Sequence, residues 1–334
     1  MKKQFVFICI LLPLLLSTCS KKNEFIEKVG KNEYITNLIP KKYKDIRPNV
    51  ILTYSHTLEG PFLTATDLVV FDHYYLILER KPQKLTLYDQ KTQQKKEYII
   101  NELKYPSRII YLQGNNFIIE DSHRYKFYKL SFQPKNENFS MNDTITKENI
   151  CSLSFFKDKL LGIKKEKGKS HIVFLDDQLE IQNIFLSFDS DYIIYQCYPD
   201  GLVVADIMNY HIWNYDWKGL LKENISLSSQ ELLKSKGRGF FNRFNFPYDN
   251  DFTSPAALNR IWTDYDHEKR LRIILQTNLM DKKDIFYYYD IFIEGKIIAR
   301  IPYNYNILCW NYDNFYFTDK EKNIRCLKLY WKED

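Results

Sequence analysis

The feature of this sequence that most constrains its fold is a group of strand-like apolar runs that recurs along most of the chain. The first copy, LVVFDHYYLILERKPQKLTLYDQ at residues 68–90, contains three apolar runs separated by a tight turn and a polar turn. Five later segments repeat this order, and each has Asp or Asn in its first turn, residue types that turns favour. These six turn residues are Asp72, Asn115, Asp158, Asp200, Asp266 and Asp313.

The six turn residues are spaced by 43, 43, 42, 66 and 47 positions. Repeats of about 40–50 residues that each contain several strands are typical of a β-propeller, where every repeat forms one blade. Aromatic residues make up 16% of the chain, and such rings pack well on pleated strands. The alternative is a β-sandwich or two smaller β domains, but no linker rich in Pro, Gly or Ser divides the chain.

Six copies predict six blades, and the sixth copy lacks a strand. It ends at Trp331 after three strands, whereas residues 49–55, NVILTYS, precede the first copy and belong to no blade. We predict that this N-terminal strand completes the last blade, because closing the ring removes two exposed sheet edges. The expected fold is therefore an all-β, six-bladed β-propeller over residues 49–334. Residues 229–257 break the strand pattern and are interpreted as an insertion between blades 4 and 5.

The N-terminus is a targeting segment rather than part of the fold. Two lysines precede an apolar run at residues 5–16, which is shorter than the roughly 20 residues of a membrane-spanning helix. The run ends in Leu-Ser-Thr-Cys, which resembles the lipobox of bacterial lipoproteins. The resemblance implies that residues 1–18 are removed as a signal peptide, that Cys19 is lipidated, and that residues 19–48 form a tether. An ordinary secretory signal with an incidental cysteine is the alternative.

Charge and cysteine content exclude several classes of partner. Removing residues 1–18 takes away two lysines and no acids, so the net charge of +6 becomes +4. With no basic arm, an exported protein of this charge is not expected to bind nucleic acid. The remaining cysteines lie apart in apolar runs without a CxxC pair, so we predict buried thiols rather than disulfides, and neither a metal nor a cofactor. They are Cys151, Cys197, Cys309 and Cys326.

Together, the lipobox, the tether and six degenerate blades with repeats such as YPDGLVVAD (residues 198–206) resemble the TolB-like or NHL-like propeller lipoproteins of Bacteroidetes. This resemblance spans the whole mature chain and implies a six-bladed fold and a lipid-anchored location in the cell envelope. The residues after Cys19, Ser-Lys-Lys-Asn-Glu, lack the acidic cluster associated with surface export in that group. We therefore expect a protein of the outer membrane that faces the periplasm.

No motif in the sequence specifies a catalytic reaction, so no catalytic residue is predicted. His267-Glu268 is not followed by a second His at zinc-protease spacing, and no GxSxG elbow is present. Asp121-Ser122-His123 are consecutive, whereas a catalytic triad needs residues that converge in space. The enzymatic alternative is a metal-assisted hydrolase or lyase that uses acids at the channel mouth. Its candidate ligands are Asp67, Glu120 and Asp206.

The insertion is the predicted binding surface. Its segment KGRGFFNRFNFPY, residues 236–248, interleaves arginines with aromatic residues, which is the composition of binding hot spots. Loops that join one blade to the next surround the channel on one face, so other inter-blade loops should contribute to this surface. The predicted residues are Arg238, Phe240, Phe241, Arg243, Phe244 and Tyr248 in the insertion, and Arg108, Arg260, Trp262, Tyr303 and Tyr305 elsewhere. Packing and rim salt bridges are their alternative roles.

The sequence thus favours a non-catalytic, lipid-anchored propeller that binds a saccharide, a peptide or an envelope protein on its loop-rich face. A metal-assisted enzyme and a structural subunit of an envelope complex are the two alternatives. Three acids that converge at the channel axis would favour the enzyme, and an exposed arginine–aromatic surface would favour binding.

The lipidation of Cys19 can be tested directly. Cys19→Ala removes the thiol that would carry the lipid, so we expect loss of labelling by a radioactive fatty acid and release of the protein from membranes. Cys9→Ala, within the predicted signal peptide, is the matched control and should retain both properties. Continued labelling of Cys19→Ala would show that any lipid is attached elsewhere.

Overall fold

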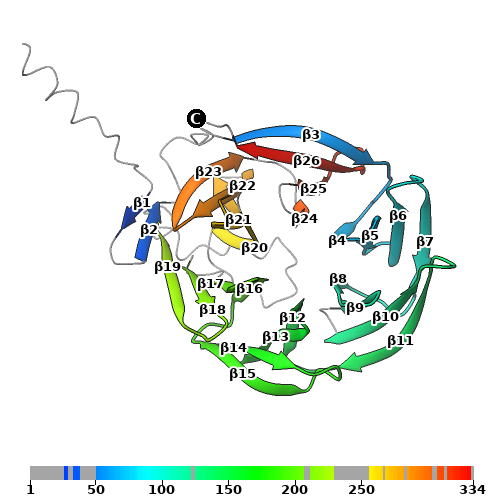
Figure 1. Cartoon of the computed structure of the whole chain (residues 1–334), viewed down its shortest axis with the longest axis horizontal. Helices are drawn as coiled ribbons and strands as arrows, with labels where there is room; N and C mark the ends of the chain where they lie inside the picture. Colours follow the sequence, from blue (N-terminus) through cyan, green and yellow to red (C-terminus); the bar gives the residue numbers. More distant parts are fainter. Residues whose placement is uncertain are drawn as a thin grey trace, which may run out of the picture.

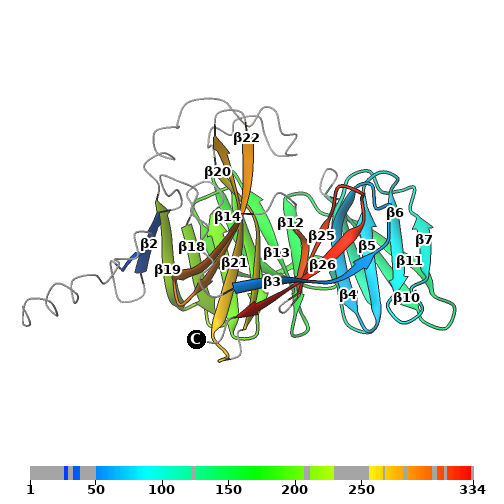
Figure 2. The ribbon, with the colours of Figure 1, turned by 90° about the horizontal axis from the view of Figure 1, so that it is seen from above.

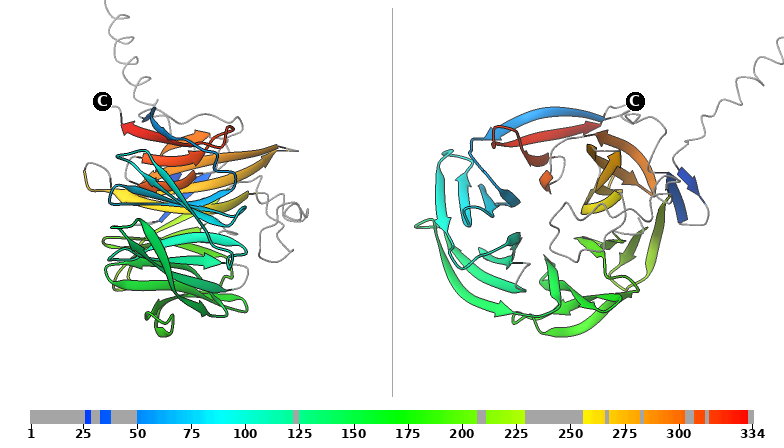
Figure 3. Two further views of the ribbon diagram at one scale, coloured as in Figure 1. Left: turned by 90° about the vertical axis from the view of Figure 1, so that its right-hand side faces the viewer. Right: turned by 180° about the vertical axis from the view of Figure 1, so that it is seen from behind.

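The strand-and-turn repeats fold into six sheets arranged as a ring, and the predicted all-β, six-bladed propeller is confirmed (Figure 1). The computed structural model describes residues 26–28, 33–37, 50–121, 125–206, 211–228, 256–265, 268–281, 284–302, 307–311 and 314–331. Within these residues every regular element is a strand, and none is a helix long and apolar enough to cross a membrane. The ring is wider than it is tall (Figure 2 and Figure 3).

The first three blades are antiparallel sheets of four strands in chain order. Blade 1 contains β4 (Ala65–Phe71), β5 (Tyr74–Glu79), β6 (Lys84–Asp89) and β7 (Lys95–Ile99). Blade 2 contains β8 (Pro106–Tyr111), β9 (Asn116–Asp121), β10 (Lys126–Gln133) and β11 (Asn138–Thr146). Blade 3 contains β12 (Ile150–Phe156), β13 (Lys159–Glu166), β14 (Lys169–Leu175) and β15 (Ile181–Phe188).

The last three blades complete the ring. Blade 4 contains β16 (Ile193–Tyr198), β17 (Gly201–Asp206), β18 (His211–Asp216) and β19 (Leu221–Ser228). Blade 5 contains β20 (Ala256–Tyr265), β21 (Leu271–Asp281), β22 (Asp284–Ile293) and β23 (Lys296–Pro302). Blade 6 contains β24 (Ile307–Asn311), β25 (Asn314–Thr318), β26 (Ile324–Trp331) and β3 (Val50–Leu58).

An N-terminal strand closes the ring, as predicted. β3 is the outer strand of blade 6 and pairs with β26 in antiparallel register, from Val50 opposite Trp331 to Leu58 opposite Ile324. Figure 1 shows the two strands side by side, β3 in blue and β26 in red. The first and last parts of the chain are therefore held in one sheet, and the ring has no open seam at blade 6.

Local sequence explains where the first strands reverse. Asp72, Asn115 and Asp158 adopt φ angles of 47°, 65° and 61°, in the left-handed region that Asp and Asn tolerate better than most residues. They form the first turns of blades 1 to 3, which is why these residue types recur in the sequence. Asp266 and Asp313 lie outside the described residues.

The fourth of these turns depends on a glycine. Gly201 begins β17, and a Cβ atom at this position would lie 1.9 Å from the carbonyl oxygen of Tyr215 on β18. Only a residue without a side chain permits the two strands to pair so closely here.

Aromatic and aliphatic side chains from adjacent blades form the core. Between blades 1 and 2, Phe71 packs edge-on against Phe117 and Phe132, with ring centroids 5.0 and 5.6 Å apart. Other buried clusters join blades 2 and 3, 3 and 4, 5 and 6, and 6 and 1. Edge-to-face pairs contribute about 0.5–1.5 kcal/mol each beyond burial of area, so much of the aromatic content of the sequence stabilises the contacts between blades.

The segment predicted to be a tether contains two strands. β1 (Ile26–Lys28) and β2 (Glu33–Asn37) form an antiparallel hairpin, and β2 pairs in parallel with β19. Blade 4 is thereby extended to six strands. The hairpin covers the outer edge of β19, which would otherwise be open to pairing with another chain.

Two glycine substitutions test the close approach at β17. Gly201→Ala should lower the free energy of unfolding by roughly 2–3 kcal/mol, because the backbone of β18 must shift to admit the methyl group. Gly168→Ala is the control, since a Cβ atom there meets nothing within 4 Å and only its φ of 77° is unfavourable. That strain costs about 1 kcal/mol. Urea unfolding measures both, and equal losses would contradict the proposed overlap.

Candidate functional site

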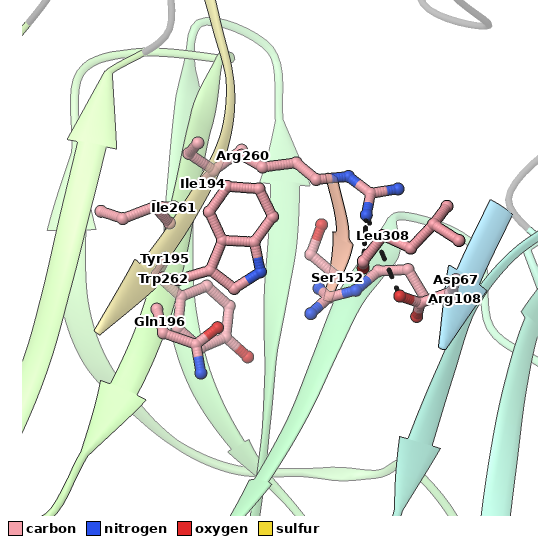
Figure 4. A pocket seen from close by; sticks show the side chains of 10 residues that line it. All are labelled: Asp67, Arg108, Ser152, Ile194, Tyr195, Gln196, Arg260, Ile261, Trp262 and Leu308. Atoms are coloured by element: carbon pink, nitrogen blue, oxygen red, sulfur yellow. Dashed lines mark hydrogen bonds and ion pairs between the residues drawn. The ribbon is translucent and has the colours of Figure 1, made fainter. Parts of the chain in front are cut away.

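The channel contains a cavity of about 190 Å³ that is lined by the innermost strand of every blade (Figure 4). The strands are β4, β8, β12, β16, β20 and β24. Each contributes at least one side chain to the wall, and Trp262 and Gln196 add to those of β20 and β16. One residue from each strand in turn is Asp67, Arg108, Ser152, Tyr195, Arg260 and Leu308.

Irregularities in the inner strands determine which side chains reach the cavity. Five of the six inner strands carry one extra residue relative to the neighbouring strand, the pattern of a β-bulge. In β4, β8 and β20 the residue that follows the bulge is Asp67, Arg108 and Arg260, respectively. Because a bulge redirects the side chains beside it, these three charged residues are turned toward the channel.

Arg260 links three blades through its guanidinium group. Nη1 donates to the carbonyl oxygens of Ile307 at 3.1 Å and Leu308 at 2.9 Å, and Nη2 donates to the carbonyl oxygen of Thr66 at 2.7 Å. Leu308 and Thr66 are the bulged residues of β24 and β4, so their carbonyl groups lie outside the regular ladders. Arg260 satisfies these groups, which gives it a structural role in addition to its place in the cavity wall.

Two carboxylates, the partly buried Asp67 and the buried Glu120, make equivalent connections between blades 1, 2 and 3. Asp67 Oδ2 accepts the N–H of Ile109 at 2.9 Å. Glu120 accepts the N–H groups of Ser152 at 3.0 Å and Leu153 at 3.3 Å, both in the bulge of β12. Burial raises the pKa of both carboxyl groups, although nearby arginine charge and these hydrogen bonds oppose the shift.

Arg108 differs from Arg260 because its guanidinium group has no direct partner. Among the described residues it forms neither a hydrogen bond nor an ion pair, although its charge acts on both Asp67 and Glu120. Figure 4 shows Arg108 and the indole ring of Trp262 facing the same space from opposite sides. The five N–H donors of this arginine therefore remain available to an occupant of the cavity.

Tyr195 contributes a buried hydroxyl group. The residue is 4% exposed, and within the described part of the chain its hydroxyl oxygen has no hydrogen-bond partner. An unsatisfied buried hydroxyl costs about 1–3 kcal/mol of stability, so its place in a cavity wall calls for an explanation. Burial also holds the pKa of this phenol well above its ordinary value, so the group is protonated and can donate.

Three of the predicted binding residues come together, since Arg108, Arg260 and Trp262 all line the cavity. They lie on the inner strands β8 and β20, however, and not in inter-blade loops as predicted. Sequence reasoning did not select Tyr195, because it lies in an ordinary strand, IIYQCY, with no motif beside it. The remaining predicted residues lie outside the described residues, and their roles stay predictions. They are Cys19, Arg238, Phe240, Phe241, Arg243, Phe244, Tyr248, Tyr303 and Tyr305.

The three acids considered as metal ligands do not line the cavity together. Asp67 lines the cavity, whereas Glu120 and Asp206 are buried on the second strands of their blades. Within the described ranges, no group of three or more His, Cys, Asp or Glu side chains is arranged to hold a metal ion.

The four cysteines in the described part of the chain are free thiols: Cys151, Cys197 and Cys326 are buried, and Cys309 is partly exposed. Burial raises the pKa of Cys151 to about 11 and the pKa of Cys197 and Cys309 to about 12. A thiol with such a pKa is almost entirely protonated at neutral pH and is a poor nucleophile.

The fold and its channel define the protein as a six-bladed β-propeller, and comparison with solved structures agrees. A putative exported protein from Bacteroides fragilis is 11% identical with a TM-score of 0.53, over 90% of this chain and 99% of that one. Hydrazine synthase from Kuenenia stuttgartiensis is 12% identical with a TM-score of 0.52, over 78% of this chain and 75% of that one. Virginiamycin B lyase from Staphylococcus aureus is 10% identical with a TM-score of 0.47, over 84% and 99%.

At these identities the first two similarities show a shared fold and nothing finer. No protein-family model matches the sequence, and no curated protein matches it significantly.

The raised pKa of Glu120 predicts how stability depends on pH. An acid whose pKa is higher in the folded protein than in the unfolded chain stabilises the fold at low pH, and this contribution is lost as the pH rises through the folded-state value. Glu120→Gln removes the titrating group. The fall in the free energy of unfolding between about pH 4 and pH 8 should therefore be smaller than in the wild type.

Urea unfolding at a series of pH values measures this difference. Glu180→Gln is the control, because this acid is 65% exposed and pairs with Lys147 on the surface. It should leave the pH dependence of the wild type unchanged. An unaltered slope in Glu120→Gln would show that this carboxyl group does not titrate as its burial requires.

Proposed function

We propose that the protein is a lipid-anchored propeller of the cell envelope that binds a ligand, or a protruding group of a protein partner, at the mouth of its channel without catalysing a reaction. One observation carries the proposal. Within the described part of the chain, one cavity is lined by a half-buried arginine that makes no hydrogen bond, a tyrosine whose buried hydroxyl has no partner, and an indole ring. In small-molecule sites, a few convergent polar groups fix the orientation of the ligand and an apolar surface packs against it.

The location rests on the N-terminal sequence. The lipobox-like Leu-Ser-Thr-Cys places Cys19 where bacterial lipoproteins carry their lipid. The propeller similar in fold from Bacteroides fragilis is described as a putative exported protein, which supports export and the resemblance to Bacteroidetes lipoproteins. We therefore propose an outer-membrane protein that faces the periplasm.

The test is a comparison of captured ligands. Immobilised wild-type protein is incubated with an envelope extract of the cells that produce it, and retained compounds are identified by mass spectrometry. Trp262→Ala should retain at least about tenfold less, because truncating an aromatic anchor at the centre of a site commonly costs about 2 kcal/mol or more. Equal retention by the two proteins would contradict binding in the channel.

Trp217→Ala is the matched control for loss of an indole ring. Trp217 lies in the turn between β18 and β19, where it stacks on Phe156 and donates to the carbonyl oxygen of Pro199 at 3.1 Å, so it should not affect capture. Recovery of the captured compound unchanged after prolonged incubation is expected of a binding protein. Its conversion would favour the enzymatic alternative instead. The double variant Arg238→Ala/Arg243→Ala tests in parallel whether the insertion contributes.

A further inference from the structure

Two donor groups beside the channel cavity, on β8 and β16, have no acceptor among the described residues. Arg108 and the hydroxyl of Tyr195 both lack a hydrogen-bond partner among the described residues. The guanidinium group presents five N–H donors in a planar fork and accepts nothing. An occupant that satisfied these groups would therefore have to bring acceptors of its own.

The two nearest carboxylates do not fill this role. Both oxygens of Glu120 already accept backbone N–H groups of β12, and Oδ2 of Asp67 accepts the N–H of Ile109. Oδ1 of Asp67 lies on the side of Arg260, 4.0 Å from its Nη1. These acids are used to link blades. Their charges lie near Arg108, yet no described residue forms a hydrogen bond or ion pair with its guanidinium group.

We infer that the channel is a binding site for an oxyanion group, a carboxylate or a phosphate, that Arg108 and the Tyr195 hydroxyl hold while the rest of a small ligand lies against Trp262. This inference rests on the proposed function and specifies the chemistry of its ligand. Two oxygens of a carboxylate or phosphate match the two parallel N–H donors of a guanidinium group. The phenol hydroxyl supplies a further donor from β16, on another blade.

The size of the cavity limits the ligand. About 190 Å³ corresponds to roughly six water molecules at about 30 Å³ each. An oxyanion group with one attached ring or short chain fits this volume, and the flat indole of Trp262 provides an apolar surface for it.

Simple probes test the inference before the natural ligand is known. Benzoate and inorganic phosphate represent the two sources of an oxyanion, and benzamide is the neutral analogue of benzoate with nearly the same shape. Calorimetric titration should show that benzoate, phosphate or both bind at millimolar concentrations or better, and that benzamide binds at least about tenfold more weakly than benzoate. Equal affinity for benzoate and benzamide, or no binding of either anion, would overturn the inference.

Arg108→Gln should weaken binding of the anions about tenfold or more, because it removes both the charge and the fork. Arg325→Gln is the control for the lost charge. Arg325 lies on β26, is 43% exposed and pairs with Asp319, so the affinity of this variant should equal that of the wild type. An Arg108→Gln variant that binds the anions as the wild type does would contradict the assignment.

Tyr195→Phe separates binding from folding. It removes a hydroxyl that has no hydrogen-bond partner among the described residues, so the free energy of unfolding should stay the same or rise while anion affinity falls about fivefold. Tyr198→Phe is the contrasting control, since its hydroxyl donates to Asn214 at 2.6 Å. It should lose stability and keep anion affinity. A destabilised Tyr195→Phe with unchanged affinity would show a structural hydroxyl.

The charged groups around Arg108 make a second, independent readout. The charged ones are Asp67 on β4, Glu120 on β9 and Arg260 on β20. Three further titratable groups nearby are neutral, namely Cys151, Tyr195 and Cys197. As the pH falls, Asp67 and Glu120 take up protons and the channel becomes more positive. Affinity for benzenesulfonate, which stays ionised throughout, should therefore rise between pH 8 and pH 5. A flat or opposite profile would count against an oxyanion beside these acids.

The experiments distinguish failure of the oxyanion assignment from failure of the proposed function. If wild type captures an envelope compound that Trp262→Ala loses but Arg108→Gln and Tyr195→Phe retain, the channel binds a ligand that is not held as an oxyanion. If Trp262→Ala retains the compound as well, the proposed function itself is wrong.

Discussion

Pairing of the backbone groups displaced by the inner-strand bulges is the constraint on which the rest of this propeller depends. A strand with an extra residue leaves N–H and C=O groups outside its ladder, and these groups cannot stay unpaired when buried. Here the partners come from neighbouring blades. Arg260 reaches the bulged carbonyls of β24 and β4, and Glu120 accepts the bulged N–H groups of β12. The same contacts that repair the strands therefore hold the blades around the axis.

This arrangement explains why charged side chains lie around the channel. Charged side chains are needed at the axis for the fold, and most of their hydrogen-bonding capacity is used by backbone groups. β16 is the exception. Its register with β17 has no bulge, so this strand displaces no backbone groups that a neighbouring blade would have to pair. Tyr195 lies on this regular strand, and its hydroxyl has no hydrogen-bond partner among the residues that the structure describes. The two groups proposed to bind a ligand, Arg108 and the Tyr195 hydroxyl, are thus groups that do not pair with the backbone of a bulge.

The sequence was sufficient for the architecture because propeller repeats have strong local signals. Turn residues such as Asn115 and Asp158 tolerate a left-handed backbone, and the unmatched strand at residues 49–55 could only complete the last blade. The site was harder to predict. Arg108 and Trp262 were selected from inter-blade loops, but nothing in the strand IIYQCY distinguishes Tyr195. A bulge depends on how two strands pair, which no single segment encodes, so neither the bulges nor the role of Arg260 could be foreseen.

The buried thiols give the folded state a chemical distinction from the unfolded one. In the native ring the buried Cys151 and Cys197 have pKa values of about 11 and about 12, far above the roughly 8.5 of a free cysteine in water. An oxidising compartment captures exposed thiolates and leaves protonated, enclosed thiols alone. In such a compartment, chains that unfold would expose these cysteines and have them oxidised, whereas chains whose ring stays closed would keep them reduced. Burial of the thiols in the core would then by itself distinguish folded chains from unfolded ones.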